Sequence, residues 1–296
     1  MTAQSTAPSD PDEPFIDDIT VPATDGFRLA ATLFLPRRSR NAAVLINSAT
    51  AVPRKIYRSF ASYLAGRGAV VLTYDYRGIS GSRPKTLVGF KASMADWATL
   101  DMTGAIAWMR QRYGDWPLGF VGHSFGGQGL GLAPNNTEVA RALLVAAQAG
   151  YWGLMTPPER YRVYAFMNFV GVPLTRMLGY APGFMGLGED LPKDAFLQWT
   201  AWVMSRHYMF DDANLPALAN FPTFKGRLRA HTFTDDPWAT PSAVELLCSH
   251  YTGTAPEIVK LAPADVGTAR IGHFGFFRPE QQDGLWRGAA DWLLAE

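Results

Sequence analysis

The strongest constraint on the fold of this chain is a serine turn between an apolar segment and a glycine-rich segment. The apolar run Leu118–Val121 leads into Gly122-His123-Ser124-Phe125-Gly126, and Gly127-Gln128-Gly129 follows. A Gly-x-Ser-x-Gly pattern alone is weak, but a strand before it and a helix after it make it specific. The flanking glycines leave room for a strained turn that exposes a serine hydroxyl above the end of a sheet. The sequence therefore predicts a strand–turn–helix unit with Ser124 as a candidate nucleophile.

Strand and helix patterns alternate on both sides of this unit. The apolar and alternating runs predict strands at residues 16–21, 28–34, 42–46, 69–74, 118–121, 141–147, 228–234 and 258–261. Helical spacing predicts helices at residues 57–67, 94–113, 244–251 and 281–294, and one directly after Ser124. Such alternation is typical of a mostly parallel central sheet flanked by helices, which is an α/β architecture.

The alternation stops between residues 153 and 226. This stretch is rich in aromatic residues, methionine and proline, and Phe196, Trp199 and Trp202 recur at helical spacing. We therefore expect a core of residues 15–152 and 227–296, with a helical lid insertion at 153–226 over the carboxyl edge of the sheet. Residues 1–14 are small, polar and acidic, which predicts a disordered tail.

Composition limits the partners and the location of the protein. The 27 basic and 26 acidic residues are mixed along the chain without a basic run, so we expect no nucleic-acid partner. The longest apolar runs are too short to span a bilayer, and the N-terminus lacks the pattern of a signal peptide. The single cysteine, Cys248, cannot form an internal disulfide, which is typical of a reducing compartment. These features predict a cytoplasmic protein and leave its oligomeric state open.

A serine hydroxyl is a weak nucleophile unless a base removes its proton and a carboxylate orients that base. After a serine turn of this kind, the acid and then the histidine follow along the chain. Four histidines follow Ser124, and only His273 lies in a loop between the last predicted strand and the last helix. His273 is therefore the predicted base. The others lie in the insertion, in a strand and at a helix end: His207, His231 and His250.

The acid is expected in the loop after the penultimate strand, which reads Asp235-Asp236-Pro237. We favour Asp236, because its spacing from the turn near Pro241 is usual for an acid in this position. Asp235 stays the alternative, and its ordinary role would be that of a turn or cap residue ahead of the next helix.

A tetrahedral intermediate needs two backbone N–H groups to stabilise its oxyanion. One is predicted at Phe125, directly after the nucleophile. The other is predicted in the loop that follows the strand at 42–46, at Ala49, with Thr50 as the alternative.

The substrate is expected to be a small molecule. Most aromatic residues of the insertion should form its own core. A few should face the nucleophile, and we expect Trp199, Trp202 and Phe274 to line an apolar pocket. No cluster of fixed charge surrounds the predicted site, so an apolar acyl or alkyl group is expected. The histidines are scattered and show no zinc-site spacing, so neither a metal nor another cofactor is expected.

Together these motifs resemble the α/β-hydrolase superfamily, particularly its hydrolase-4 or serine-aminopeptidase-like branch. The resemblance covers nearly the whole chain from about residue 16, and four motifs carry it: Gly122-His123-Ser124-Phe125-Gly126-Gly127, Asp75-Tyr76-Arg77-Gly78, Asp235-Asp236-Pro237 and Ile271-Gly272-His273-Phe274. The resemblance implies an α/β-hydrolase fold with a lid. It also implies that the protein is a serine hydrolase. The expected reaction is cleavage of a carboxylic ester or thioester through an acyl-enzyme on Ser124.

Two positions depart from the family pattern. Relatives carry His-Gly at the oxyanion loop, where this chain has Asn47-Ser48, and Ser80 replaces the second glycine of the Asp-x-Arg-Gly-x-Gly-x-Ser run. We expect this second loop to be structural, with Arg77 bracing its neighbours.

Two alternatives to ester hydrolysis stay open at this level. The same triad could cleave amides or carbon–carbon bonds, or transfer an acyl group to an alcohol. A different class would be a non-catalytic receptor of the same fold. Receptors of that kind usually lose a triad residue, whereas this chain has all three in order.

Overall fold

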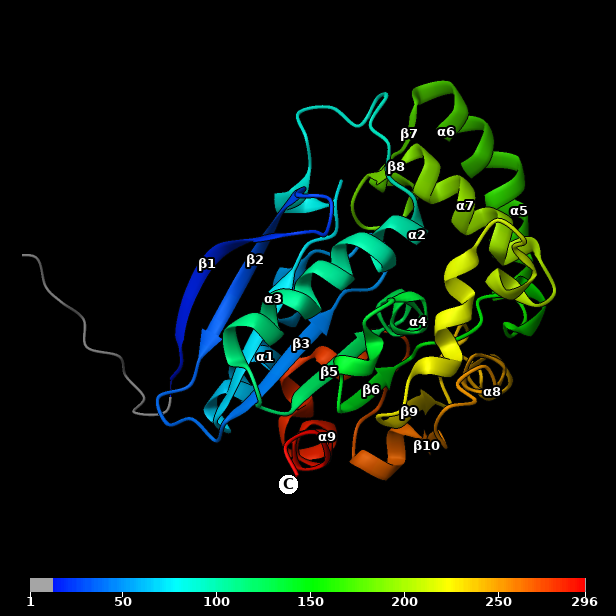
Figure 1. Ribbon diagram of the computed structural model, residues 1–296. Helices are drawn as coiled ribbons and strands as arrows, with labels where there is room; N and C mark the ends of the chain where they lie inside the picture. Colours follow the sequence, from blue (N-terminus) through cyan, green and yellow to red (C-terminus); the bar gives the residue numbers. More distant parts are fainter. Residues whose placement is uncertain (1–12, 296) are drawn as a thin grey trace, which may run out of the picture.

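A computed structural model describes residues 13–295 of the chain, and residues 1–12 of the predicted tail lie outside them. An eight-stranded sheet runs through the molecule, in the order β1-β2-β4-β3-β5-β6-β9-β10 (Figure 1). Its strands are β1 (Phe15–Pro22), β2 (Arg28–Leu35), β3 (Ala42–Asn47), β4 (Ala69–Tyr74), β5 (Leu118–His123), β6 (Arg141–Val145), β9 (Arg227–Phe233) and β10 (Glu257–Leu261). β1, β2 and β4 pair antiparallel in turn, and all pairs from β4 to β10 are parallel.

The central strands are buried on both faces. Every residue of β4 and β5 is buried, which agrees with their continuous apolar sequences. Parallel strands need crossover helices, and helices flank this sheet (Figure 1). They are α1 (Arg58–Gly66), α2 (Met94–Asp96), α3 (Thr103–Tyr113), α4 (Phe125–Gly129), α8 (Pro241–Cys248) and α9 (Arg287–Leu293). The predicted mostly parallel sheet flanked by helices is confirmed.

Between β6 and β9 the chain forms three helices: α5 (Glu159–Phe166), α6 (Val172–Leu178) and α7 (Lys193–Met204). In Figure 1 they lie together beyond one end of the sheet. The sequence indicated no strand here, but β7 (Tyr180–Ala181) and β8 (Leu191–Pro192) form a short antiparallel ribbon. Strands of two residues are too short to show the alternation on which the prediction relied.

The turn between β5 and α4 is strained at the serine. Ser124 has φ +50° and ψ −116°, a backbone conformation that L-residues rarely adopt. Two glycines make this turn possible through close backbone contacts. A Cβ atom on Gly122 would lie 2.4 Å from Gly127 Cα, and one on Gly126 would lie 2.3 Å from the Asn47 carbonyl oxygen. The predicted need for glycine on both sides of the serine is therefore steric.

Arg77 joins three segments near the antiparallel edge of the sheet. Its guanidinium donates to both carboxylate oxygens of Asp25, at 2.7 and 2.9 Å, and to Asp101 Oδ1 at 2.7 Å. The Arg77 carbonyl also accepts the indole N–H of Trp97 at 3.0 Å. Burial raises the pKa of Asp101 to about 7, although Arg77 acts to lower it. Arg77 thus braces its neighbours, as the sequence indicated.

We expect Arg77→Ala to lower the free energy of unfolding by about 3–5 kcal/mol, because it leaves the buried Asp101 carboxylate without its partner. Urea denaturation at pH 8 measures this loss. Arg83→Ala is the matched control, since the Arg83–Asp190 pair (2.8 Å) is partly exposed and should cost less than about 1 kcal/mol. Equal losses in the two variants would contradict a bracing role for Arg77.

Candidate active site

The loops after β9 and β10 bring His273 and Asp236 together. His273 Nδ1 lies 2.7 Å from Asp236 Oδ2, and the carboxylate is fully buried. The other oxygen, Oδ1, accepts the backbone N–H groups of Trp238 (2.8 Å) and Ala239 (3.1 Å). Burial alone would raise the pKa of Asp236, but His273 and these N–H groups outweigh it, and the pKa lies below its usual value. The carboxylate stays ionised and fixes the imidazole with Nδ1–H towards it.

The neighbouring carboxylate has a different position. Asp235 Oδ2 accepts the backbone N–H of Ile271 at 2.9 Å, and Oδ1 accepts that of Gly272 at 3.0 Å. Asp235 therefore holds the backbone of the loop that carries His273, and within residues 13–295 no hydrogen bond joins it to the imidazole.

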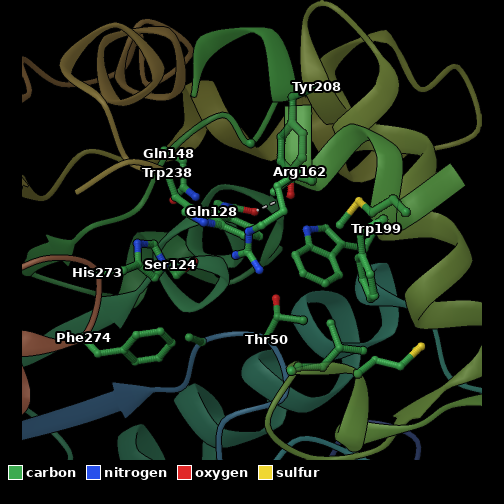
Figure 2. Close-up of a pocket in the computed structure, with 18 residues that line it drawn as sticks. Thr50, Ser124, Gln128, Gln148, Arg162, Trp199, Tyr208, Trp238, His273 and Phe274 are labelled. Atoms are coloured by element: carbon green, nitrogen blue, oxygen red, sulfur yellow. Dashed lines mark hydrogen bonds between the residues drawn. The ribbon is translucent and has the colours of Figure 1, made fainter. Parts of the chain in front are cut away.

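Ser124 and His273 line the same cavity, whose volume is about 250 Å³. Figure 2 shows the two side chains next to each other at its edge. No hydrogen bond joins Ser124 Oγ to the imidazole within the described residues. Catalytic hydrogen bonds are often long in free enzymes and shorten when a substrate binds.

The N–H groups near Ser124 differ in their availability. Phe125 begins α4, and neither its N–H nor that of Thr50 donates to another residue in the described part of the chain. The N–H of Ala49 instead donates to the Tyr57 hydroxyl at 2.8 Å. Ala49 and Thr50 both line the cavity. The structure thus argues against Ala49, the predicted second oxyanion donor, because that N–H is already paired, and it favours Thr50.

A buried chain of hydrogen bonds, which the sequence did not indicate, connects the loop that carries Ala49 to His273. The Tyr57 hydroxyl lies 2.9 Å from His123 Nδ1, and His123 Nε2 lies 2.8 Å from the His273 carbonyl oxygen. Burial lowers the pKa of His123 to about 3, so the imidazole is neutral. With one acceptor and one donor nitrogen, it accepts from Tyr57 and donates to the backbone of His273. In the sequence, the one indication that His123 belongs to the site is its position directly before Ser124.

The predicted pocket residues separate into two groups. Trp199 and Phe274 line the cavity, as expected. Trp202 does not, because it is buried within the insertion and its indole N–H donates to Asp212 Oδ2 at 2.8 Å. Helical spacing predicts that Trp199 and Trp202 lie on the apolar side of one helix, but it does not predict which segment packs against each of them. The sequence missed several lining residues, among them Gln128, Gln148, Met167, Tyr208 and Trp238.

Residues 13–295 contain no group of three or more histidine, cysteine, aspartate or glutamate side chains that could hold a metal ion. No helix of that part is both long and apolar enough to cross a membrane.

Among the remaining histidines, His231 in β9 is expected to make the free energy of unfolding depend on pH. Burial lowers its pKa to about 4, and its Nδ1 has no hydrogen-bond partner. Between pH 6.5 and 4 the unfolded chain therefore binds a proton that the folded chain does not, so stability falls as the pH falls. We expect His231→Leu to remove roughly 3 kcal/mol of this acid-dependent loss at pH 4. Urea titrations of both proteins between pH 7 and 4 test this, and parallel pH profiles would contradict it.

Comparison with solved structures gives the same fold over nearly the whole chain. The esterase domain of a Rhodothermus marinus protein aligns with a TM-score of 0.57 and 16% identity, covering 95% of this chain and 98% of that one. An esterase from Exiguobacterium antarcticum aligns with a TM-score of 0.60 and 14% identity, covering 94% and 99%. A serine hydrolase from Xanthomonas campestris, described as lacking a lid, aligns with a TM-score of 0.54 and 15% identity, covering 98% and 100%.

The sequence comparisons address the family directly. No curated protein matches the chain. A sequence model of the alpha/beta hydrolase family matches residues 43–282, from β3 to the segment before α9. This match confirms the predicted superfamily, whereas the hydrolase-4 or serine-aminopeptidase-like branch stays a prediction. Since the match covers most of the sequence, the chain belongs to the alpha/beta hydrolase family of enzymes.

Proposed function

We propose that this protein hydrolyses carboxylic esters through an acyl-enzyme on Ser124. The observation that carries the proposal is the 2.7 Å contact between His273 and the buried Asp236, at the edge of the cavity that Ser124 also lines. Two of the structurally similar proteins named above are esterases.

In the first half of the reaction, Ser124 Oγ attacks the ester carbonyl carbon while His273 Nε2 takes its proton. The N–H groups of Phe125 and Thr50 stabilise the negative charge on the carbonyl oxygen. The carbon–oxygen bond to the alcohol then breaks, and His273 returns the proton to the leaving alcohol. In the second half, His273 removes a proton from water, which attacks the acyl-enzyme and releases the acid and Ser124.

Asp236 orients His273 and stabilises its charged form during both steps. We also infer that residues 153–226 act as a lid. Val163 and Phe166 of α5 and Trp199 of α7 line the same cavity as Ser124, so movement of these helices would open or close it. The cytoplasmic location stays a prediction.

A burst experiment tests the acyl-enzyme. Mixing the protein with excess 4-nitrophenyl acetate should release one equivalent of 4-nitrophenol rapidly and then reach a slower steady state. Acid quenching should give a peptide that carries one acetyl group at Ser124. Neither a burst nor an acetylated peptide should form with Ser124→Ala. Ester turnover that acetylates no residue, or turnover retained in Ser124→Ala, would refute the proposal.

The same reaction run with a competing alcohol separates hydrolysis from acyl transfer. With glycerol added, a hydrolase should still release mainly acetic acid. Predominant formation of the glycerol ester would identify an acyltransferase with the same nucleophile.

A further inference from the structure

Two buried glutamine side chains line the cavity, and the proposed hydrolysis uses neither of them. Gln128 lies on α4, four residues after the nucleophile, and Gln148 follows β6. Each is only 2% exposed, and both line the cavity together with Ser124 and His273. Figure 2 shows both of them near Ser124, with the Tyr208 hydroxyl bonded to Gln128. The cavity wall is therefore polar at a place where the sequence predicted an apolar pocket.

The orientation of Gln128 follows from its neighbour. The Tyr208 hydroxyl donates to Gln128 Oε1 at 3.0 Å. Burial raises the pKa of Tyr208, so this hydroxyl keeps its proton and acts as a donor. With Oε1 accepting from Tyr208, the amide nitrogen Nε2 is left as a donor, and the bond from Tyr208 is the one hydrogen bond of this side chain within residues 13–295.

Gln148 supplies the complementary group. Its Oε1 is buried and has no hydrogen-bond partner in the described part of the chain. Buried polar atoms in proteins are nearly always satisfied, so an unpaired one on a residue that lines a cavity points to a partner that a ligand would supply. A flip of the carboxamide would place Nε2 at this position, and that atom would be unpaired as well.

The charges of the cavity favour a neutral ligand. Arg162 is the only permanently charged side chain among the described lining residues. Glu159 already pairs with it through two contacts, of 2.8 and 2.6 Å, and also accepts the indole N–H of Trp238 at 2.7 Å. A carboxylate on the substrate would therefore find no unpaired cation here.

We propose that Gln128 and Gln148 form a subsite for a neutral hydroxyl or secondary amide, carried by the substrate on one side of its ester bond. Gln128 Nε2 donates to the oxygen of this group, and Gln148 Oε1 accepts its N–H or O–H. The inference rests on the proposed ester hydrolysis and narrows its substrate class. A plain hydrocarbon chain would leave both glutamines unpaired and would be the poorer substrate.

Two matched pairs of esters test the subsite on either side of the ester bond. Ethyl N-acetylglycinate is compared with ethyl pentanoate, and 2-acetamidoethyl acetate with pentyl acetate, by acid release in a pH-stat. The members of each pair have the same chain length and differ in the amide. In the wild type, the amide ester of at least one pair should have a kcat/KM at least about 10-fold higher than its hydrocarbon partner.

Variants connect this preference to the two residues. Gln128→Leu and Gln148→Leu should each lower the ratio within that pair by about 10-fold, chiefly through slower hydrolysis of the amide ester. Gln198→Leu is the matched control, because Gln198 lies on α7 and accepts the Ala95 N–H at 3.0 Å rather than lining the cavity. Its ratio should equal that of the wild type. Thermal unfolding verifies that every variant is folded.

The outcomes distinguish the subsite from the proposed function. Ser124-dependent hydrolysis with no preference for the amide in either pair would overturn the subsite alone. A preference that survives both leucine substitutions would also overturn it. Absence of Ser124-dependent hydrolysis of all four esters, in folded protein, would refute the ester hydrolase and the subsite with it.

Discussion

Replacing His273 with alanine is expected to lower kcat for ester hydrolysis by about 10⁴- to 10⁶-fold, and Ser124→Ala should have a similar effect. Without the imidazole, none of the other described residues that line the cavity carries a base for the Ser124 proton. The nearby His123 already bonds to the Tyr57 hydroxyl and to the His273 carbonyl oxygen. The double variant should be no worse than either single variant, because the two side chains act as one unit. Steady-state kinetics on 4-nitrophenyl acetate measures all three proteins.

His207→Ala is the control for this series. His207 is exposed, pairs with Asp211 at 2.8 Å and does not itself line the cavity. Its kcat should stay within about twofold of the wild type, as for other surface substitutions. Folded His273→Ala that keeps a tenth or more of the wild-type activity would remove His273 from the role of base.

The second large effect is expected for Asp236→Asn, which should lower kcat by about 10⁴-fold. Asp236 Oδ1 accepts two backbone N–H groups, so the asparagine oxygen must occupy that side and its NH₂ group must face His273. A donor facing Nδ1 forces the proton of the imidazole onto Nε2, and this tautomer cannot accept the Ser124 proton.

Asp235→Asn serves as the matched comparison. It exchanges one of two acceptors that hold the backbone of Ile271 and Gly272, so it should disturb the position of the His273 loop. We expect a loss of about 10-fold or less, since one partly buried hydrogen bond is weakened while the tautomer of His273 is unchanged. A larger loss in Asp235→Asn than in Asp236→Asn would transfer the role of the acid to Asp235.

The sequence predicted those parts of the molecule that depend on local sterics and chain order. The serine turn needs glycines because backbone atoms lie within 2.4 Å of the positions where their side chains would begin. The order of strands and helices then limits which loops can reach Ser124, and this placed His273 and the Asp235–Asp236 pair at the same edge of the sheet.

The sequence could not assign roles that depend on contacts between distant segments. Ala49 and Thr50 are adjacent in one loop, and only the hydroxyl of Tyr57 distinguishes their N–H groups. Trp199 and Trp202 lie on one helix, and their different surroundings follow from what packs against each of them. Gln128 was detectable, because it lies in the first turn of the helix that the sequence predicts directly after the nucleophile.

Reaction with a fluorophosphonate probe tests the activated serine most directly, because this reagent reports nucleophilicity without requiring the natural substrate. Intact-mass analysis and peptide mapping would be carried out on the wild type, Ser124→Ala, His273→Ala and His207→Ala. We predict one label per wild-type molecule, located at Ser124 and retained in His207→Ala, with none in Ser124→Ala and strongly slowed labelling in His273→Ala. Folded wild-type protein that stays unlabelled, or that is labelled at another residue, would contradict an activated nucleophile at Ser124.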